Sequence, residues 1–502
     1  MKITSILNVL LPSLFSIHTA IAQIAGDESW FYDYGGPAQS EPFDFEIQGD
    51  YLYAGGLFLT TDGVPGDDGK NISRFDLRIE SWQALPGLNA GLNGRVDRIH
   101  AADDGCLYIG GNFSNAGNTV ATRIVKFDPR IDPAITNPWS PLSDPASTLV
   151  ASNQDNGPTP GQVRGIVKSG DYIYVGGNFS NASWPLNERY IRRFQISTSQ
   201  WQPVGAGLAQ VSGSAGEIRT VIANPANGEI YVGGNLNPSL AKWNGSIWST
   251  IGGGVNGVVR ALALHPDGKL YVGGDFTSVG SGGNLITAND IASYNPSNNT
   301  WNNLNGGFDD QYIQSNGTTF DADGVFDLKI APDGRVIAVG DIQADPARTN
   351  TNLDHIAVWD GTGTWKNLGS GVGNTGSQIV NCVEVSWRGD IYVGGVFAEG
   401  FRNASSANST FARFAAAGAD LTGYIPGAAL NPTSKIQNIS GSMNISLLTR
   451  PGTTYQAERS PDLMFTNPVN VGTISGDGTV KSINVGVPNS PKQFFRFRAT
   501  GF

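Results

Sequence analysis

Four aspartates in one polar segment are the residues of this chain best suited to chemistry. Asp309, Asp310, Asp321 and Asp323 fall within residues 305–324. Paired carboxylates can act as acid and base in the cleavage of a glycosidic bond, whereas acidic loops more often bind Ca²⁺ or are simply solvated. These residues therefore support two hypotheses, a hydrolase or lyase acting on a polysaccharide and a non-catalytic ligand site.

The histidines and cysteines form no recognisable metal or nucleophile set. His100, His265 and His355 have no second nitrogen ligand at the short spacings of zinc or copper sites, and the chain has no Cys-x-x-Cys motif. Cys106 and Cys382 have apolar neighbours, so we expect two buried free thiols in inner strands. Apart from Ca²⁺ on acidic loops we expect no cofactor and no metal site, and we assign no catalytic residue.

Tryptophan stacks well on sugar rings, and the chain contains 11 tryptophans. Seven of them recur in one short strand of a repeated unit, and two more hold a recurring aromatic position one strand earlier. Packing accounts for these nine. Trp184 lies in a polar loop instead, and we predict that it contacts a ligand.

Composition and charge narrow the class of protein. Glycine accounts for 66 of the 502 residues and only 15% of residues are charged, which is typical of many short strands joined by tight turns. The formal net charge is −11 at pH 7. Phosphate binding needs clustered positive charge, so this balance argues against nucleic acids and anionic membranes as partners.

The N-terminus has the pattern of an export signal. Lys2 precedes a mostly apolar stretch at 6–17, and Ala20-Ile21-Ala22 provides a small-x-small cleavage site. We therefore interpret residues 1–22 as a signal peptide. Later stretches fall short of the ~20 apolar residues of a membrane span, so we expect a secreted or cell-surface protein without one.

An internal repeat organises most of the chain. The hexamer aromatic-x-Gly-Gly-x-Phe, or a close variant of it, occurs seven times at spacings of 40 to 66 residues. Such spacings are typical of four-stranded propeller blades with variable loops. The seven copies begin at residues 53, 108, 174, 231, 271, 337 and 392, and the copy at 337–342 is degenerate.

Each copy predicts the second strand of a four-stranded blade, and the paired glycines suit a bulge or a close approach to the next blade. The seventh blade lacks its own fourth-strand tryptophan, which Trp30 can supply. We therefore predict that residues 30–34 pair with 411–414 and close a seven-bladed β-propeller, since a shared strand protects open sheet edges.

The repeats resemble those of the kelch-like, galactose-oxidase-like propellers, and more closely the "YVGG-x-F" repeats of secreted bacterial proteins and of fungal cortical polarity marker proteins. The resemblance covers about residues 29–416 and implies a propeller without specifying its function, because propellers include enzymes, lectins and scaffolds. The copper-radical oxidases of the superfamily need two tyrosine and two histidine ligands, a set that this sequence does not provide.

Beyond the repeats the sequence continues to alternate like β-strands. Residues 454–463 and 494–498 resemble a C-terminal module of secreted Verrucomicrobia and Planctomycetes proteins, although Phe465 stands where that module often has tryptophan. We predict an all-β protein with a signal peptide at 1–22, a propeller at 23–416, a linker at 417–423 and a small β-sandwich-like domain at 424–502.

Loop lengths favour one face of the propeller as the functional face. The turns between first and second strands are short, whereas the loops between second and third strands and two inter-blade loops are long. Both long sets emerge on the same face, and binding residues concentrate on such loops. We predict a monomeric binding or scaffolding protein that recognises an extracellular glycan, peptide or surface component there, with the enzyme reading as the alternative.

Overall fold

The computed structural model describes most of the chain between residues 41 and 414, together with short N-terminal segments and six C-terminal strands. The described residues are 30–31, 37–38, 41–61, 64, 68–87, 91–142, 161–179, 189–210, 216–308, 312–313, 319–320, 324–342, 353, 355–361, 363–368, 371–372, 379–386, 389–397, 409–414, 435–439, 442–448, 454–460, 469–475, 480–486 and 494–501. The predicted signal peptide and the predicted linker lie outside them.

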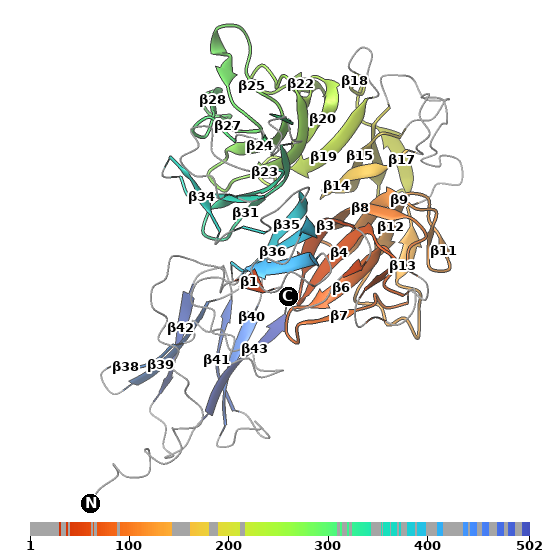
Figure 1. Ribbon diagram of the computed structural model, residues 1–502. Coiled ribbons are helices and arrows are strands. Elements are labelled where there is room, and N and C mark those ends of the chain that lie inside the picture. Colours follow the sequence, from red (N-terminus) through yellow and green to blue (C-terminus); the bar gives the residue numbers. More distant parts are fainter. Residues whose placement is uncertain are drawn as a thin grey trace, which may run out of the picture.

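Seven antiparallel sheets, six of four strands and one of five, follow one another around a ring, which confirms the predicted seven-bladed β-propeller (Figure 1). The first strands of neighbouring blades contact one another all the way round, so these strands line the central channel. They are β3 (Glu41–Gln48), β8 (Arg95–Ala101), β14 (Val163–Ser169), β19 (Glu217–Ala223), β23 (Val258–Leu264), β31 (Val325–Ile330) and β35 (Ile379–Val385).

The second strands carry the repeated hexamer, and the third strands pair with them. The second strands are β4 (Tyr51–Leu57), β9 (Leu107–Asn112), β15 (Tyr172–Gly177), β20 (Ile230–Asn237), β24 (Leu270–Asp275), β32 (Val336–Gly340) and β36 (Ile391–Phe397). The third strands are β6 (Ile72–Asp76), β12 (Ile124–Phe127), β16 (Ile191–Gln195), β21 (Leu240–Trp243), β27 (Ile291–Asn295), β33 (Ile356–Trp359) and β37 (Ser409–Phe414).

The fourth strands each contain one of the recurring tryptophans. They are β7 (Ser81–Gln83), β13 (Trp139–Pro141), β17 (Gln200–Pro203), β22 (Trp248–Thr250), β28 (Thr300–Asn302), β34 (Trp365–Asn367) and, for the seventh blade, β1 (Trp30–Phe31). Trp30 pairs with Phe414 and Phe31 with Arg413, and Figure 1 shows the red β1 beside the blue strands of the last blade. The N-terminal strand therefore closes the ring as predicted.

Short accessory strands extend the loops between second and third strands and between blades. They are β2 (Pro37–Ala38) with β5 (Thr60–Thr61), β10 (Asn115–Ala116) with β11 (Thr119–Val120), β18 (Ala209–Gln210) on β20, β25 (Ser278–Val279) with β26 (Ile286–Thr287), and β29 (Tyr312–Ile313) with β30 (Thr319–Phe320). Among the described residues, the helical element given by the structure is a single 3₁₀ turn, η3 (Gly282–Asn284). None of the helices there is long and apolar enough to cross a membrane.

The paired glycines of the hexamer perform two separate packing tasks. A side chain on the first glycine would overlap the next blade. At Gly110, for example, it would overlap the side chain of Val163. A side chain on the second glycine would overlap the first strand of its own blade. At Gly234, for example, it would overlap the carbonyl oxygen of Glu217. The degenerate sixth copy keeps only the second glycine, Gly340, where a side chain would overlap the carbonyl oxygen of Gly324.

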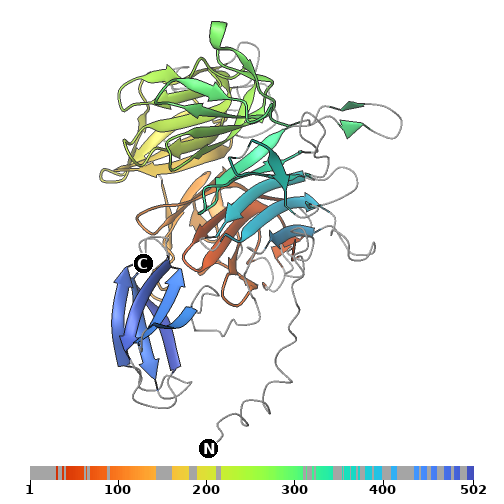
Figure 2. The same ribbon diagram turned by 90° about the vertical axis from the view of Figure 1, so that its left-hand side faces the viewer.

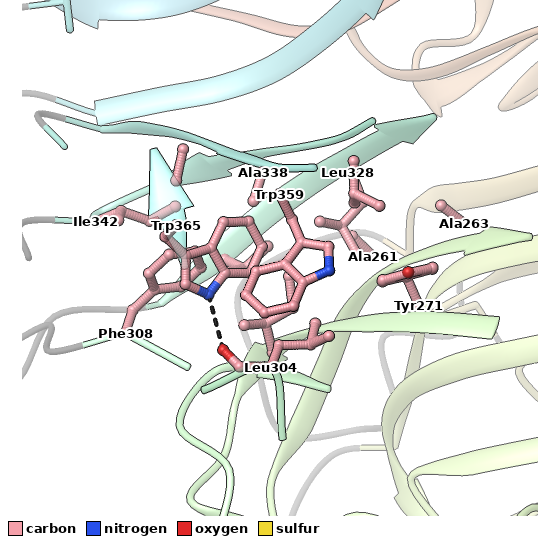
Figure 3. Close-up of a cluster of buried hydrophobic side chains, with 14 of the residues drawn as sticks. Ala261, Ala263, Tyr271, Leu304, Phe308, Leu328, Ala338, Ile342, Trp359 and Trp365 are labelled. Atoms are coloured by element: carbon pink, nitrogen blue, oxygen red, sulfur yellow. Dashed lines mark hydrogen bonds between the residues drawn. The ribbon is translucent and has the colours of Figure 1, made fainter. Parts of the chain in front are cut away.

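The fourth-strand tryptophans join neighbouring blades. The indole nitrogens of five of them donate to a backbone carbonyl of the preceding blade, as Trp201 does to Leu142 at 2.9 Å and Trp365 to Leu304 at 3.1 Å. The buried indole nitrogen of Trp82 makes no such bond within the described residues. Figure 3 shows the second of these bonds, with Trp359 and Phe308 packed beside Trp365. Packing between blades therefore explains these residues, as the sequence predicted.

Two three-stranded antiparallel sheets make up the described part of the C-terminal region, drawn in blue in Figure 2. One sheet contains β38 (Lys435–Ile439), β39 (Ser442–Leu448) and β42 (Val480–Gly486). The other contains β41 (Val469–Ser475), β40 (Thr454–Ser460) and β43 (Phe494–Gly501). This is the small all-β domain expected after the propeller, while its exact boundaries and those of the linker stay a prediction.

Candidate binding site in the central channel

The residues that the sequence singled out for ligand contact cannot be placed. Trp184, Asp309, Asp310, Asp321 and Asp323 lie outside the described residues. The structure therefore neither brings these five side chains together nor separates them, and their role stays a prediction.

The histidines connect blades and turns. His100 Nε2 accepts the backbone N–H of Lys168 in the next blade at 3.0 Å, and burial lowers the pKa of His100, so its imidazole is neutral at pH 7. His265 Nε2 lies 3.1 Å from the carbonyl oxygen of Gly334, also in the next blade. Both histidines therefore connect their own blade to the next one.

The two cysteines are free and buried, as expected. Their predicted positions need one correction. Cys382 lies in the innermost strand β35, but Cys106 directly precedes the second strand β9, because the turn after β8 is five residues long, from 102 to 106. Within the described residues, no group of three or more His, Cys, Asp and Glu side chains is arranged to hold a metal ion.

A β-bulge at one equivalent position in every blade builds the most distinctive site of the molecule. In all seven blades the pairing of the first and second strands shifts by one residue near the start of the first strand. A bulge leaves its extra residue unpaired and redirects that side chain. In blade order the extra residues are Phe43, Asp97, Arg164, Arg219, Arg260, Phe326 and Asn381.

All seven bulge residues line one cavity in the channel, and we call them the bulge ring. The cavity has a volume of about 220 Å³, and Arg95 and Arg98 of β8 complete its lining. The bulges come near the first residues of the innermost strands, so the cavity lies towards the end of the channel where the inter-blade connections enter. This is the end at which the sequence predicted a binding face.

The bulge ring has two chemically distinct halves. Blades 3, 4 and 5 contribute Arg164, Arg219 and Arg260, and blade 2 adds Arg95 and Arg98 next to them. Blades 6, 7 and 1 contribute Phe326, Asn381 and Phe43. Because the blades follow one another in order around the channel, the basic half faces the half made of two phenyl rings and an amide.

Neighbouring polar groups hold the arginines in place. The Gln162 side-chain oxygen accepts from Arg95 at 3.0 Å and from Arg164 at 2.7 Å. Glu217 pairs with Arg164 at 2.8 Å and with Arg219 at 3.0 Å, which links blades 3 and 4. The guanidinium groups are therefore positioned before any ligand arrives, which lowers the entropic cost of binding.

A phenyl ring packs against the arginine at each end of the basic half. The guanidinium carbon of Arg95 lies 4.6 Å from the centre of the Phe43 ring, and that of Arg260 lies 5.0 Å from the centre of the Phe326 ring. These distances are within the range of cation–π attraction. Each border arginine is thus fixed against one phenyl ring of the opposite half.

Carboxylates pair with four of the arginines that line the cavity. Asp97 pairs with Arg95, Glu217 pairs with Arg164 and Arg219, and Asp44 pairs with Arg98. The side chains of Arg95, Arg98, Arg164 and Arg219 are only 23–27% exposed. Burial lowers the pKa of Arg164 and raises that of Asp97, because both charged forms lose solvation.

Further along the same strands, buried carboxylates connect the blades nearest the ring closure. Asp44 accepts the backbone N–H of Ile99 at 2.5 Å, and Glu384 pairs with Lys329 at 2.6 Å. Burial raises the pKa of Asp44 and of Glu384 to about 7, although the nearby cations oppose this shift. A pKa in that range often marks a catalytic acid, but neither side chain lines the cavity, and both are bonded to a neighbouring blade.

Sequence reasoning missed the bulge ring because its arginines are spread over the chain at about one per blade. The signal was present in the repeat, since each bulge residue lies at one fixed position in the first strand, between Val163 and Gly165 or between Ile218 and Thr220 for example. Aligning the first strands of the seven blades would have revealed this position. The overall charge of −11 conceals the gathering of five arginines around one cavity.

Comparisons with known proteins agree with the fold. Residues 265–288 match the model of a β-propeller domain of unknown function (DUF5122). A curated relative, "Polarized growth protein L1" from a Phoma species, is 23% identical over 310 residues, which is 57% of this chain. The match spans only about a fifth of that relative, 21% of its length.

Solved structures resemble the chain only distantly. The extracellular domain of a one-component system from Bacteroides thetaiotaomicron has a TM-score of 0.46 at 13% identity, over 88% of this chain and 48% of that one. PorZ, a surface component of the type-IX secretion system of Porphyromonas gingivalis, has a TM-score of 0.43 at 11% identity, over 92% and 60%. A xyloglucanase from Xanthomonas campestris has a TM-score of 0.41 at 13% identity, over 72% and 53%.

Proposed function

We propose that the protein is a secreted or cell-surface binding propeller, without catalytic activity, that holds an extracellular ligand at the long-loop end of its central channel. The ligand is a glycan, a peptide or a component of a cell surface. One observation carries the proposal. Every blade directs one side chain into the same cavity through the same bulge, and the resulting lining combines charged, amide and aromatic groups as ligand sites do.

Placement of the cavity near the inter-blade connections supports a site that continues onto the loops. Trp184 belongs to this proposal as a stacking residue on the long-loop face. The four aspartates at 309, 310, 321 and 323 belong to it as acceptors for hydroxyl groups of the ligand. Their carboxylates are also the residues on which the alternative, a hydrolase or lyase, would depend.

A screen followed by mapping tests the proposal. The full chain is applied to a glycan array and a peptide array, and the best binder is then added in a hydrogen-exchange experiment. We expect slower exchange in the first strands β14, β19 and β23. Protection confined to the opposite end of the channel, or to residues 435–501, would refute the channel site.

Activity measurements decide between binding and catalysis. The same ligand is incubated with the protein and its fragments are analysed. We expect it to be recovered intact. Turnover that disappears when Asp309 or Asp321 is replaced by asparagine would establish the enzyme instead.

A further inference from the structure

Two side chains of β8 bring an unpaired acceptor and an unpaired donor to the cavity. Asp97 is the bulge residue of blade 2, its side chain is 7% exposed, and its Oδ1 atom pairs with Arg95 at 2.5 Å. Within the described part of the chain, Oδ2 of Asp97 and Nε of Arg95 are buried without a hydrogen-bond partner. Buried polar atoms are rarely left unpaired, because each of them costs free energy. A ligand group that both donates and accepts hydrogen bonds would serve both atoms.

The charged groups around the cavity disfavour an ionic ligand of either sign. Arg98 pairs with Asp44 at 3.1 Å. The carboxylates of Glu46 and Asp327 act on the same guanidinium group. An anion would therefore approach Asp97 in the lining, and a cation would approach the guanidinium groups, so that a like charge opposes each of them. A neutral ligand avoids both costs.

Ion pairs further along the first strands restrict how a ligand enters. Lys329 of blade 6 pairs with Glu384 of blade 7 at 2.6 Å and with Glu46 of blade 1 at 3.3 Å. Each of these residues lies three positions beyond the bulge residue of its own strand. A chain that ran through the whole channel would have to separate these pairs, whereas the end of a chain would not. The cavity of about 220 Å³ is smaller than the roughly 300 Å³ at which sites for drug-sized ligands begin, so it fits one terminal unit.

An aromatic ring lies beside the unpaired atoms. Phe43 lines the cavity and is half-buried, and the guanidinium carbon of Arg95 lies 4.6 Å from the centre of its ring. Every hydroxyl group of a sugar can both donate and accept a hydrogen bond, and a sugar ring also has an apolar C–H face that packs on an aromatic ring. The backbone of a peptide has its donors and acceptors on separate atoms. These features together favour a sugar.

We propose that the bulge ring is a subsite for one neutral sugar residue at the end of an extracellular glycan. Hydroxyl groups of this residue donate to Asp97 and accept from Arg95 and Arg164, while its apolar face packs on Phe43. This inference rests on the proposed function, because it names the ligand class of the same cavity.

Titration calorimetry of the full chain with small probes tests the ligand class. The neutral probes are the methyl glycosides of glucose, galactose, mannose, xylose and fucose. The charged probes are the methyl glycosides of glucuronate, galacturonate and glucosamine, and the peptide probe is a triserine with blocked ends. We expect the best neutral glycoside to bind at least about tenfold more tightly than every charged glycoside, because a like charge opposes each of these. It should also bind more tightly than the peptide.

Three variants, each titrated with the best neutral glycoside, test the residues. Asp97→Asn should weaken binding at least about tenfold, since a hydrogen bond to a charged group contributes about that factor. Phe43→Leu should weaken it at least about threefold through the loss of the aromatic surface. Asp103→Asn is the matched control and should leave binding unchanged, because this aspartate lies in the turn after β8 and is 82% exposed. If Asp97→Asn fails to fold, Phe43→Leu and the order of the probes still test the proposal.

Each contrary result identifies which proposal fails. Tightest binding of a charged glycoside or of the peptide overturns the neutral-sugar subsite and leaves a channel binding site standing, and so does a gain of affinity in Asp97→Asn. Failure of all five neutral glycosides to bind, when an array ligand protects the first strands from exchange, does the same. Exchange protection away from the first strands refutes the proposed function itself.

Discussion

Replacing Trp365 by alanine should cause one of the largest losses of stability available in the propeller. The indole is 3% exposed, and its ring centre lies 4.5 Å from that of Phe308 and 5.2 Å from that of Trp359 (Figure 3). Burial of an aromatic side chain removes about 150–250 Å² from water. At about 25 cal/mol per Å² that area contributes roughly 4–6 kcal/mol.

The measured loss should lie near 4 kcal/mol, because truncations of this kind typically cost about 3–5 kcal/mol. Trp365→Ala also removes the hydrogen bond to the Leu304 carbonyl, so the acceptor loses its partner as well as its packing. The equivalent tryptophan of the fifth blade, Trp301, is only partly buried. Trp301→Ala should therefore cost less than Trp365→Ala, although both indoles donate to the preceding blade.

Urea denaturation of the two variants and of a control provides the assay. Lys366→Ala serves as control, since Lys366 lies on the same strand β34 and is 52% exposed. We expect it to change the free energy of unfolding by less than about 1 kcal/mol. A loss below 2 kcal/mol for Trp365→Ala, or a larger loss for Trp301→Ala, would contradict the assignment of these residues to the packing between blades.

Three other predictions concern the ring closure, the buried acids and the loop face. Deleting residues 23–36 should lower the melting temperature of the whole propeller, because β1 is then lost and β37 becomes an open edge; an unchanged melting temperature would count against closure. Asp44 has a pKa of about 7 in the folded protein, above its ordinary 3.8, so its contribution to stability should be complete below pH 4 and should decline by up to roughly 4 kcal/mol as the pH rises through 7. Asp44→Asn should remove this dependence in urea titrations at pH 4 and pH 8, and an equal pH dependence in both proteins would disprove the assignment. Trp184→Ala should weaken ligand binding by at least ~1 kcal/mol in calorimetry with little change in stability, and unchanged affinity would remove Trp184 from the site.

The fold could be predicted from the sequence because its motif has a direct packing cause. In six of the seven hexamers the first glycine accommodates the next blade, and in all seven the second accommodates the first strand beside the bulge, so the pattern recurs wherever a blade recurs. Trp30 could be assigned to the seventh blade because every other blade has a tryptophan in its fourth strand and the seventh blade has none of its own after its third strand.

The residues that line the cavity could not be predicted from the sequence in the same way. A side chain such as Arg219 reaches the cavity only because the strand pairing shifts by one residue beside it, and that shift depends on contacts with a second strand. Net charge was misleading as well, since it averages the cavity arginines with all 43 acidic residues of the chain. The face that the sequence predicted as functional and the bulge ring lie at the same end of the channel, because the inter-blade connections enter the innermost strands there. Ligand binding at that face stays a prediction.

A crystal structure of the full chain with its best array ligand bound is the most direct test of the account. We predict that the ligand lies in the cavity, within hydrogen-bonding distance of Arg164, Arg219 or Arg260 and against Phe43 or Phe326. A ligand bound at the other end of the channel or on the C-terminal sheets would contradict it.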